Sequence, residues 1–364
     1  MKNFIKKPAL TIAVVIFVVA AIIFIEMQKP KIKTANTIQN NLLKDNKYPR
    51  APDFAGIERW INSEPLKIEQ LRGKVVLVDF WTYTCINCIR TLPYLKDWDR
   101  TYRDEGLVIV GVHSPEFEFE KKYENVLKAV NDYQLKYAVA QDNNYVTWNM
   151  YQNRYWPHKF LIDIDGYIRY DHIGEGNYED TEKMIQSLLD EKMERENKKN
   201  GVISNITKPS DVVDSNFFNI GTPEIYFGYQ FSRGNFGNPE GTKADETIDY
   251  KFPSKMTSNE VYFEGKWKNN ADNMELVGDE GSIMLVFQAK SVNIVAGSEK
   301  ASNISVYLDN NELEDKTKGF GIMADSQVKE FKLYNLANAE DYGKHSINID
   351  VFGKGFKIYT FTFG

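Results

Sequence analysis

The sequence is poor in cysteine and histidine and carries no excess of positive charge. Its 364 residues include two cysteines and four histidines, and 45 Lys and Arg stand against 51 Asp and Glu, for a net charge of −6. Because there is no global positive field to attract a phosphate backbone, we exclude nucleic acid as a partner. A structural zinc site is disfavoured as well, because it needs about four ligands and no second cysteine pair is present to complete a tetrahedron.

Long apolar runs are scarce, and the exception is ALTIAVVIFVVAAIIFI at residues 9–25. A run of this length in which only Thr11 is polar predicts one N-terminal transmembrane helix. It ends in FIEMQKPK, which has neither a small-residue cleavage site nor a lipobox cysteine, so we expect an uncleaved anchor over residues 1–28. Lysines flank both ends equally, but the short N-terminal tail favours a single-pass cell-membrane protein whose soluble domains face the extracytoplasmic side. An anchor that leaves these domains in the cytoplasm is the alternative.

A polar tether is expected over residues 29–48, and strand and helix patterns alternate after it. The apolar run VVLVDFW predicts a central buried strand. HKFLIDIDGYIRYDHIG is typical of a hairpin, with Asp165-Gly166 suited to a two-residue type I′ turn. The whole pattern predicts an α/β domain over residues 49–200, with a central sheet and flanking helices. Its other predicted segments are strands at 107–113 and 137–142 and helices at 86–103, 117–134, 146–151 and 178–197.

A charged and then turn-rich tract predicts a linker at residues 201–211, beyond which the apolar pattern has a period of two. Seven or more short strands, among them SIMLVFQA (282–289) and SVNIVAG (291–297), predict an all-β sandwich of jelly-roll type over residues 212–364. Carbohydrate-binding modules share this architecture, so glycan binding is one hypothesis for the domain. The aromatic side chains that would stack on sugars are Tyr226, Tyr229, Trp267 and Phe320.

Both cysteines lie in WTYTCINCIRTLP, three positions apart, between a predicted strand and a predicted helix. A disulfide that served only as a staple would close too small a loop to remove much chain entropy, so a redox dithiol is the favoured interpretation. At a helix N-terminus, unpaired N–H groups and the positive end of the helix dipole stabilise a Cys85 thiolate, which makes Cys85 the attacking nucleophile. Cys88, one turn further on, is then the resolving thiol.

These segments resemble a known family. VVLVDFWTYTCINCIRTLP is similar to the active-site strand and helix of thioredoxin, and LRGKVVLVDFW with FLIDIDGYI resembles the membrane-anchored TlpA/ResA-type branch. TYTCINCIRTLPYL, GVHSPEFEFEK and YWPHKFLID are closer still to the thioredoxin-like portion of DipZ-type proteins, and IYTFTFG resembles the end of their C-terminal domain. The resemblance covers about residues 50–364. It implies a thioredoxin-like fold and a thiol-disulfide oxidoreductase.

The resemblance also implies residues that act beside the cysteines. Asp79, six positions before Cys85, matches a buried carboxylate that exchanges a proton with the resolving cysteine, and burial would raise its pKa toward the range of general acid-base catalysis. The alternative for Asp79 is a strand carboxylate paired with a lysine. Trp156-Pro157 matches the segment of the family's cis-proline, beside which a substrate strand binds. Trp156 would form an aromatic wall for that substrate, and the alternative is an ordinary trans proline that enters a strand.

Three further side chains are weaker candidates. Trp81 is expected to pack under the active-site loop and to border the substrate. His113 and Glu116 follow a strand end, where α/β proteins often form sites, and either line the site or cap the next helix. No metal and no cofactor is implied beyond a redox-active disulfide between Cys85 and Cys88.

The favoured hypothesis is an enzyme that reduces or isomerises disulfides in exported thiol proteins, apocytochromes of cytochrome c maturation included. Ile86-Asn87 provides neither a cation nor a histidine to stabilise the thiolate strongly, which favours a reductant. DipZ-type proteins carry a multi-span electron-transferring domain, whereas residues 9–25 provide a single span. The resemblance therefore implies that a separate membrane protein of the CcdA/DsbD type donates the electrons.

Two alternatives belong to other functional classes. A redoxin or peroxiredoxin-like peroxidase holds peroxide with a proline and a threonine or serine ahead of its cysteine. Here Thr82 stands three positions before Cys85, but Val78 stands where the proline is needed, which counts against a peroxidase. The second alternative is a non-enzymatic glycan-binding or docking role for residues 212–364.

Overall fold

The computed structural model describes residues 47–198, 205–210, 212, 216–319 and 325–364. The predicted anchor, nearly all of the predicted tether, part of the predicted linker and Phe320 lie outside the described residues. Within the described part of the chain, no helix combines the length and the apolar character needed to cross a bilayer. Arg50–Gly364 forms one compact unit, and all the contacts discussed below lie within it.

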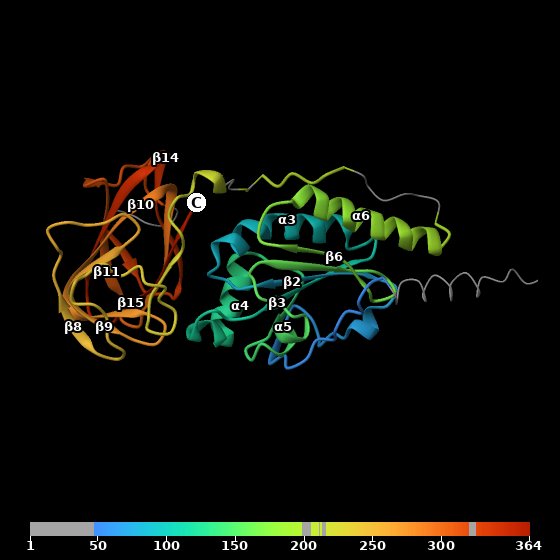
Figure 1. The fold of residues 1–364 in the computed structure, drawn as a ribbon. Helices are drawn as coiled ribbons and strands as arrows, with labels where there is room; N and C mark the ends of the chain where they lie inside the picture. Colours follow the sequence, from blue (N-terminus) through green and yellow to red (C-terminus); the bar gives the residue numbers. More distant parts are fainter. Residues whose placement is uncertain (1–46, 199–204, 211, 213–215, 320–324) are drawn as a thin grey trace, which may run out of the picture. The chain divides into compact units, whose positions relative to one another are not determined.

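A six-stranded sheet in the order β1-β4-β3-β2-β5-β6 forms the centre of the first domain (Figure 1). The adjacent strands β4, β3 and β2 are parallel, β1 pairs antiparallel with β4, β5 pairs antiparallel with β2, and β6 pairs antiparallel with β5. All seven residues of β2 are buried, as expected for an apolar run that is covered on both faces. The strands are β1 (Arg59–Ile61), β2 (Val75–Trp81), β3 (Leu107–His113), β4 (Ala138–Gln141), β5 (His158–Ile162) and β6 (Ile168–Ile173).

Helices pack on both faces of this sheet. Leu77 belongs to a core that includes residues of α3, α4 and α6, whereas Val78 belongs to a second core that includes Trp148 of α5. Because side chains alternate along a strand, Asp79 shares the face of Leu77 and lies under α3. The helices are α3 (Ile86–Tyr102), α4 (Tyr123–Asp132), α5 (Val146–Met150) and α6 (Tyr178–Arg195), with 3-10 helices at Ile68–Leu71 and Glu118–Lys121.

Two local predictions were wrong. The helix predicted over 117–134 is divided into a 3-10 helix and α4, because the backbone of Lys122 between them is extended, with φ −72° and ψ 121°. The loop at Asp165-Gly166 is not a type I′ turn, because only Gly166 of the two has a positive φ, +79°. The Gly166 N–H donates to the Asp163 carbonyl, which gives a longer loop with glycine in the left-handed position.

The second domain is all β and contains one nine-stranded sheet around its own apolar core. Two long strands, β10 (Met274–Ser298) and β14 (Lys332–Phe352), pair antiparallel along most of their length. The strands predicted at 282–289 and 291–297 are therefore two parts of β10. The chain does not turn between them, and only its pairing register with β14 shifts there. The other strands are β7 (Ile225–Tyr226), β8 (Thr247–Tyr250), β9 (Val261–Asn269), β11 (Ser302–Leu308), β12 (Asn311–Glu312), β13 (Asp325–Val328) and β15 (Phe356–Phe363).

The two domains share a buried aromatic contact. Phe117 and Phe119 of the first domain pack against Tyr359 of β15, with ring centroids 5.1 and 4.8 Å apart. Phe331 also packs on Phe119 at 5.2 Å, and its carbonyl accepts a hydrogen bond of 3.5 Å from the hydroxyl of Tyr83. Since Tyr83 stands two residues before the first cysteine, the C-terminal sheet contacts the loop that leads into the dithiol.

Candidate active site

The two cysteines lie at the N-terminus of α3 and differ in exposure. Cys85 is the N-cap of this helix, and its sulfur accepts a hydrogen bond of 3.3 Å from the backbone N–H of Cys88. Cys85 is partly exposed, whereas Cys88 is 1% exposed, and both are free thiols. Burial raises the pKa of Cys88, and the hydrogen bond and charge of Cys85 raise it further. An accessible sulfur therefore stands beside a buried neutral thiol, the arrangement that attack and resolution require.

Asp79 lies buried beneath Cys88. Burial raises the pKa of its carboxyl from 3.8 to about 7, and the positive charge of Lys159 opposes that rise. The charge of Asp79 in turn contributes to the raised pKa of Cys88, so the two groups lie within electrostatic reach of each other. A carboxyl that titrates near neutral pH can accept the proton of a neighbouring thiol and return it.

Lys159 is a site residue that sequence reasoning missed. It pairs directly with Asp79 across strands β2 and β5, is 1% exposed, and donates to the carbonyl of Gly174 at 3.2 Å. Burial lowers the pKa of Lys159, whereas the charges of Asp79 and Cys88 raise it. The sequence does place a lysine within the apolar strand HKFLI, and that position was the available signal for a buried charge.

Glu120 is a second missed carboxyl, and it contacts the loop before the cysteines. Its side chain is fully buried and accepts a hydrogen bond of 2.5 Å from the hydroxyl of Thr84, the residue that precedes Cys85. The same carboxylate accepts the N–H groups of Glu116 and Phe117 at 2.5 and 3.0 Å. Burial raises the pKa of Glu120, and these hydrogen bonds oppose the rise. Glu120 thus connects the cysteine loop to the loop that follows β3.

His113 and Glu116 occupy different places around this loop. His113 is fully buried and stacks on Tyr83 with ring centroids 5.6 Å apart, and burial lowers its pKa to about 3. Its imidazole is therefore neutral and packs under the loop. Glu116 is half-buried. Burial and the charge of Glu120 raise the pKa of Glu116 to about 8, and a side-chain hydrogen bond with Tyr226 of the C-terminal domain opposes this rise. The structure thus brings Glu116 to the rim of the site, next to the second domain.

The Trp156-Pro157 peptide bond is cis. The indole N–H of the half-buried Trp156 donates to the carbonyl of Ser114 at 3.0 Å, and its ring lies 4.4 Å from that of Trp148.

The prediction that Trp81 borders the substrate was wrong. It is fully buried and packs edge-on against His113, so it has no surface with which to border a substrate.

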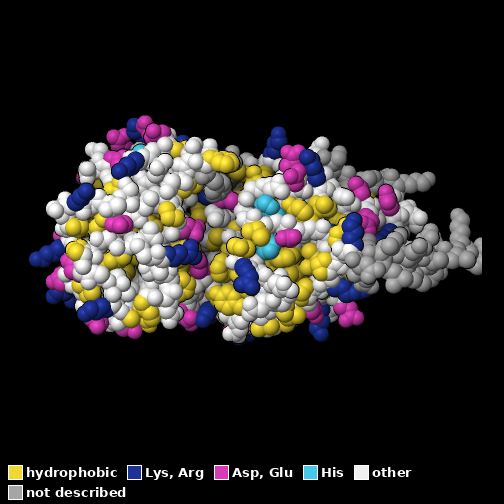
Figure 2. All heavy atoms as spheres, viewed as in Figure 1, with side chains coloured by type: hydrophobic (Ala, Val, Ile, Leu, Met, Phe, Trp, Pro, Cys, Tyr) yellow, Lys and Arg dark blue, Asp and Glu magenta, His cyan; other side chains and the backbone are white. Residues whose placement is uncertain are grey.

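An apolar surface surrounds the cis-proline segment. Figure 2 shows hydrophobic side chains gathered over the part of the molecule that carries α5 and β6, while charged side chains of both signs are scattered over the C-terminal sheet. The exposed apolar residues next to Trp156-Pro157 are Val146 and Met150 of α5, Tyr155, and Ile173 of β6, at 38 to 51% exposure. An exposed apolar surface of this kind is typical of sites that contact other proteins.

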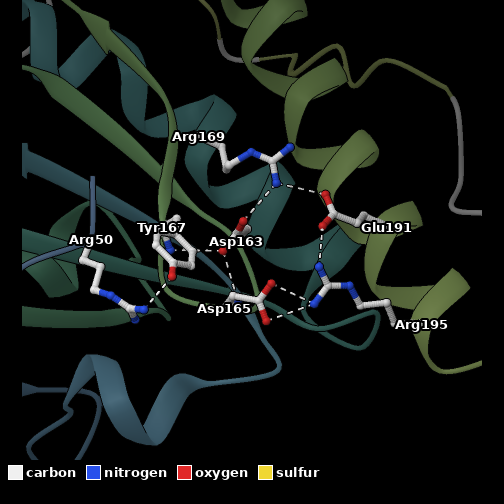
Figure 3. A network of polar contacts seen from close by, with 7 residues as sticks. All are labelled: Arg50, Asp163, Asp165, Tyr167, Arg169, Glu191 and Arg195. Atoms are coloured by element: carbon white, nitrogen blue, oxygen red, sulfur yellow. Dashed lines mark hydrogen bonds and ion pairs between the residues drawn. The ribbon is translucent and has the colours of Figure 1, made fainter. Parts of the chain in front are cut away.

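Among the described residues, Asp163, Asp165 and Glu191 are the carboxylates whose spacing would suit a metal ion. Figure 3 shows two arginines inserted between them. Arg169 donates to Asp163 and Glu191 at 2.9 and 3.0 Å, and Arg195 donates to Asp165 and Glu191 at 2.7 and 3.0 Å. These guanidinium groups supply the positive charge that a cation would bring, so the cluster is an ion-pair network between the β5–β6 loop and α6.

Two of the three predicted sugar-stacking residues that the structure describes are buried. Trp267 is fully buried in the core of the C-terminal domain, which contradicts its proposed role. Tyr226 is 8% exposed and belongs to the core cluster that it shares with the first domain. Tyr229 is exposed at 41%, and Phe320 lies outside the described residues.

Comparison with known proteins agrees with this architecture. Residues 73–168 match a family described as thioredoxin-like, and residues 222–364 match the thioredoxin-like C-terminal domain. These matches show that the chain contains a thioredoxin-like domain followed by the thioredoxin-like C-terminal domain, and that it is similar to thiol-disulfide oxidoreductases.

Particular relatives can be named. The chain is similar to Protein DipZ of Mycobacterium tuberculosis, with 38% identity over 252 residues that cover 68% of this chain and 35% of that protein. It is 29% identical to the thiol-disulfide oxidoreductase ResA of Bacillus cereus, over 38% of this chain and 76% of ResA. The crystal structure of a thiol:disulfide interchange protein DsbE from Chlorobium tepidum matches 39% of this chain and 97% of its own, at 27% identity and a TM-score of 0.35. The chain spans about a third of the length of DipZ.

Proposed function

We propose that the chain uses Cys85 and Cys88 to reduce or isomerise disulfides in exported proteins. The Cys85 thiolate attacks one sulfur of the substrate, so that the substrate S–S bond breaks, a mixed disulfide forms, and the other sulfur leaves as a thiolate that takes a proton from water. Asp79 accepts the proton of Cys88. The Cys88 thiolate then attacks the sulfur of Cys85 and releases the second substrate thiolate, which is protonated in turn. Two electrons pass to the substrate, and a Cys85–Cys88 disulfide remains.

One observation carries this proposal. The accessible sulfur of Cys85 caps α3, and the buried Cys88 has beside it a carboxyl whose pKa is raised to about 7. This arrangement supports exchange at neutral pH with Cys85 as nucleophile, Cys88 as resolving thiol and Asp79 as proton acceptor.

The cellular setting is also part of the proposal. Residues 9–25 would anchor the chain in the cell membrane with its domains on the extracytoplasmic side, and a separate membrane protein of the CcdA/DsbD type would return electrons to the disulfide. Apocytochromes of cytochrome c maturation are the substrate class that the resemblance to ResA-type proteins favours. Support for this setting comes from the apolar run and from the resemblance.

Reduction of insulin disulfides tests the activity. The full chain in detergent, with dithiothreitol as the electron source, should accelerate insulin reduction, and Cys85→Ser should abolish that acceleration. Equilibration with glutathione should give a potential near that of thioredoxin, about −270 mV, whereas a value near that of strong oxidants, about −120 mV, would exclude a reductant. Rapid consumption of hydrogen peroxide by the reduced chain would favour the peroxidase alternative instead.

For the C-terminal domain, classified from its sequence as a jelly-roll sandwich, we propose a role in docking protein substrates. Its contact with the loop that carries Tyr83 supports this role, and the burial of Trp267 counts against a sugar platform. A screen of the full chain against soluble glycans should give no selective binding. A strong, selective hit would favour the glycan-binding alternative.

A further inference from the structure

A cavity of about 500 Å³ lies between the active-site helix and the C-terminal sheet. Its lining begins at Ile86, the residue after Cys85, and follows α3 as far as Lys96. The opposite wall consists of residues of β10 and β14. A cavity of this volume is large enough to hold a bound ligand. Because it starts one residue from the nucleophile, a molecule attached to Cys85 can continue into it.

The wall formed by the sheet contains amide and hydroxyl side chains, of which Asn293 is 1% exposed and the others are half-buried. Two cross-strand pairs supply them, Ser291 with Asn338 and Asn293 with Asn335. The register between β10 and β14 shifts next to these pairs and leaves one extra residue, Leu336, on β14. Such a bulge allows two residues three positions apart to share a face, which is why both Asn335 and Asn338 line the cavity.

The asparagines are held in fixed positions by one another. The side-chain amide of Asn335 donates to the Asn293 side-chain oxygen at 2.9 Å, and the amide of Asn338 donates to the Asn335 side-chain oxygen at 2.9 Å. A carboxamide group both donates and accepts hydrogen bonds, and so does each peptide group of an extended chain. Asn293 is 1% exposed, and its amide also donates to the Thr362 carbonyl at 3.3 Å. The side-chain oxygens of the half-buried Asn335 and Asn338 are therefore the groups of this network that can accept hydrogen bonds from the N–H groups of an extended chain.

The rest of the lining favours a peptide over a sugar or an anion. Half-buried Ile86 and Ile89 of α3 and Leu333 of β14 provide apolar contacts for side chains. Tyr133 is the one aromatic residue in the lining, whereas sugar sites generally stack their ligands on rings. Among the charged residues of the lining, Arg90 is paired at 3.1 Å with the carboxylate of Glu175, and Lys96 and Asp132 carry opposite charges.

We propose that this cavity binds an extended segment of the substrate polypeptide next to the cysteine that forms the mixed disulfide with Cys85. The inference deepens the proposed function and rests on it. It gives the C-terminal domain a direct part in substrate selection, because one wall of the binding site belongs to β10 and β14. Small disulfides that do not reach the cavity gain no binding affinity from it.

Two variants of the full chain test the proposal. Leu333→Trp fills the cavity from the sheet side, and Asn338→Ala removes one amide, while neither changes a residue near the sulfurs. With insulin as the protein disulfide, KM should rise about tenfold for Leu333→Trp and about threefold for Asn338→Ala, with kcat unchanged. The rate with dithiodipyridine, a small disulfide, should stay at the parent value. Gln327→Trp and Asn311→Ala, at exposed positions of the same sheet, are the matched controls.

The outcomes separate the two proposals. A parent chain inactive with both disulfides would refute the proposed function, whereas an active parent with an unchanged KM for insulin in both variants would refute only the cavity. Equal losses with insulin and dithiodipyridine would also refute the cavity, since the damage would then lie at the dithiol. If soluble oligosaccharides inhibit insulin reduction by the parent but not by Leu333→Trp, the cavity is a sugar site and the assignment is wrong.

Discussion

Asp79 and Lys159 face each other across β2 and β5 as direct cross-strand partners, and each is 1% exposed. Their burial acts on the two groups in opposite directions, because it raises the pKa of the carboxyl and lowers the pKa of the ammonium. The charge of each opposes the effect of burial on the other. The pair therefore places a proton acceptor that titrates near pH 7 directly under the dithiol helix.

Asp79→Asn is expected to make the folded chain more stable than the parent at alkaline pH. The pKa of Asp79 is raised from 3.8 to about 7, so the folded parent retains a proton that the unfolded chain releases, and the parent loses stability as pH rises through this window. The loss amounts to at most about 4 kcal/mol and is absent below the unfolded pKa. Urea unfolding of both proteins at about pH 4, 6 and 8 measures it. A difference that does not change with pH would contradict the raised pKa.

Lys159→Met should shift the proton transfer to higher pH. Removal of the lysine charge takes away the group that lowers the pKa of Asp79, which should then titrate above about 7. The rate of Cys88 attack on a preformed mixed disulfide can be measured as substrate release at a series of pH values. The midpoint of this pH profile should move to higher pH by the same amount as the pKa of Asp79. Lys74→Met, at an exposed position just before β2, is the control and should keep the parent profile. An unchanged profile for Lys159→Met would show that the two groups are not coupled.

Glu120→Ala is expected to destabilise the chain by about 3 kcal/mol. The substitution leaves the Thr84 hydroxyl and the N–H groups of Glu116 and Phe117 without their acceptor, and unsatisfied buried groups cost about 1–3 kcal/mol each. Thermal or urea unfolding gives the value. Glu118→Ala, which removes an exposed pair with Lys121, should cost less than about 1 kcal/mol. Equal effects of the two substitutions would refute the role assigned to Glu120.

The network in Figure 3 should behave as an ion-pair cluster with no requirement for a metal. Arg169→Met leaves the buried carboxylate of Asp163 without its guanidinium partner, which should lower the free energy of unfolding by about 3 kcal/mol. Arg100→Met, at an exposed pair with Asp97, should change it by less than about 1 kcal/mol. Addition of a chelator should leave the unfolding midpoint of the parent unchanged. A fall in the midpoint on chelation would show that a metal ion binds.

Local patterns predicted the redox domain well, because its strands and helices carry strong signals. The apolar run at Val75–Trp81 is a strand from its first residue to its last, and α3 begins immediately after Cys85. Long-range pairing escaped prediction. Arg90 of α3, for example, is buried against Glu175, 85 positions away. The burial of Lys159 beside Asp79 and the contact of Glu120 with Thr84 likewise depend on tertiary packing that no short motif encodes.

The all-β class of the C-terminal domain was predicted from the sequence, but the division of the chain into strands was not. Its period-two pattern indicated an all-β domain, whereas the polar residues around Lys290 suggested a turn inside what is a single strand, β10. A register shift accommodates these residues without ending the strand, so the sequence alone could not distinguish a bulge from a turn. The same shift places both Asn335 and Asn338 in the lining of the cavity.

The most direct test of the account is a trapping experiment on Cys88→Ser. With the resolving thiol removed, Cys85 should retain substrate proteins as mixed disulfides that survive denaturing electrophoresis and disappear on reduction. Cys85→Ser should retain none, because Cys88 is 1% exposed and cannot reach a substrate disulfide. Trapping by Cys85→Ser but not by Cys88→Ser would contradict the assignment of Cys85 as the attacking nucleophile.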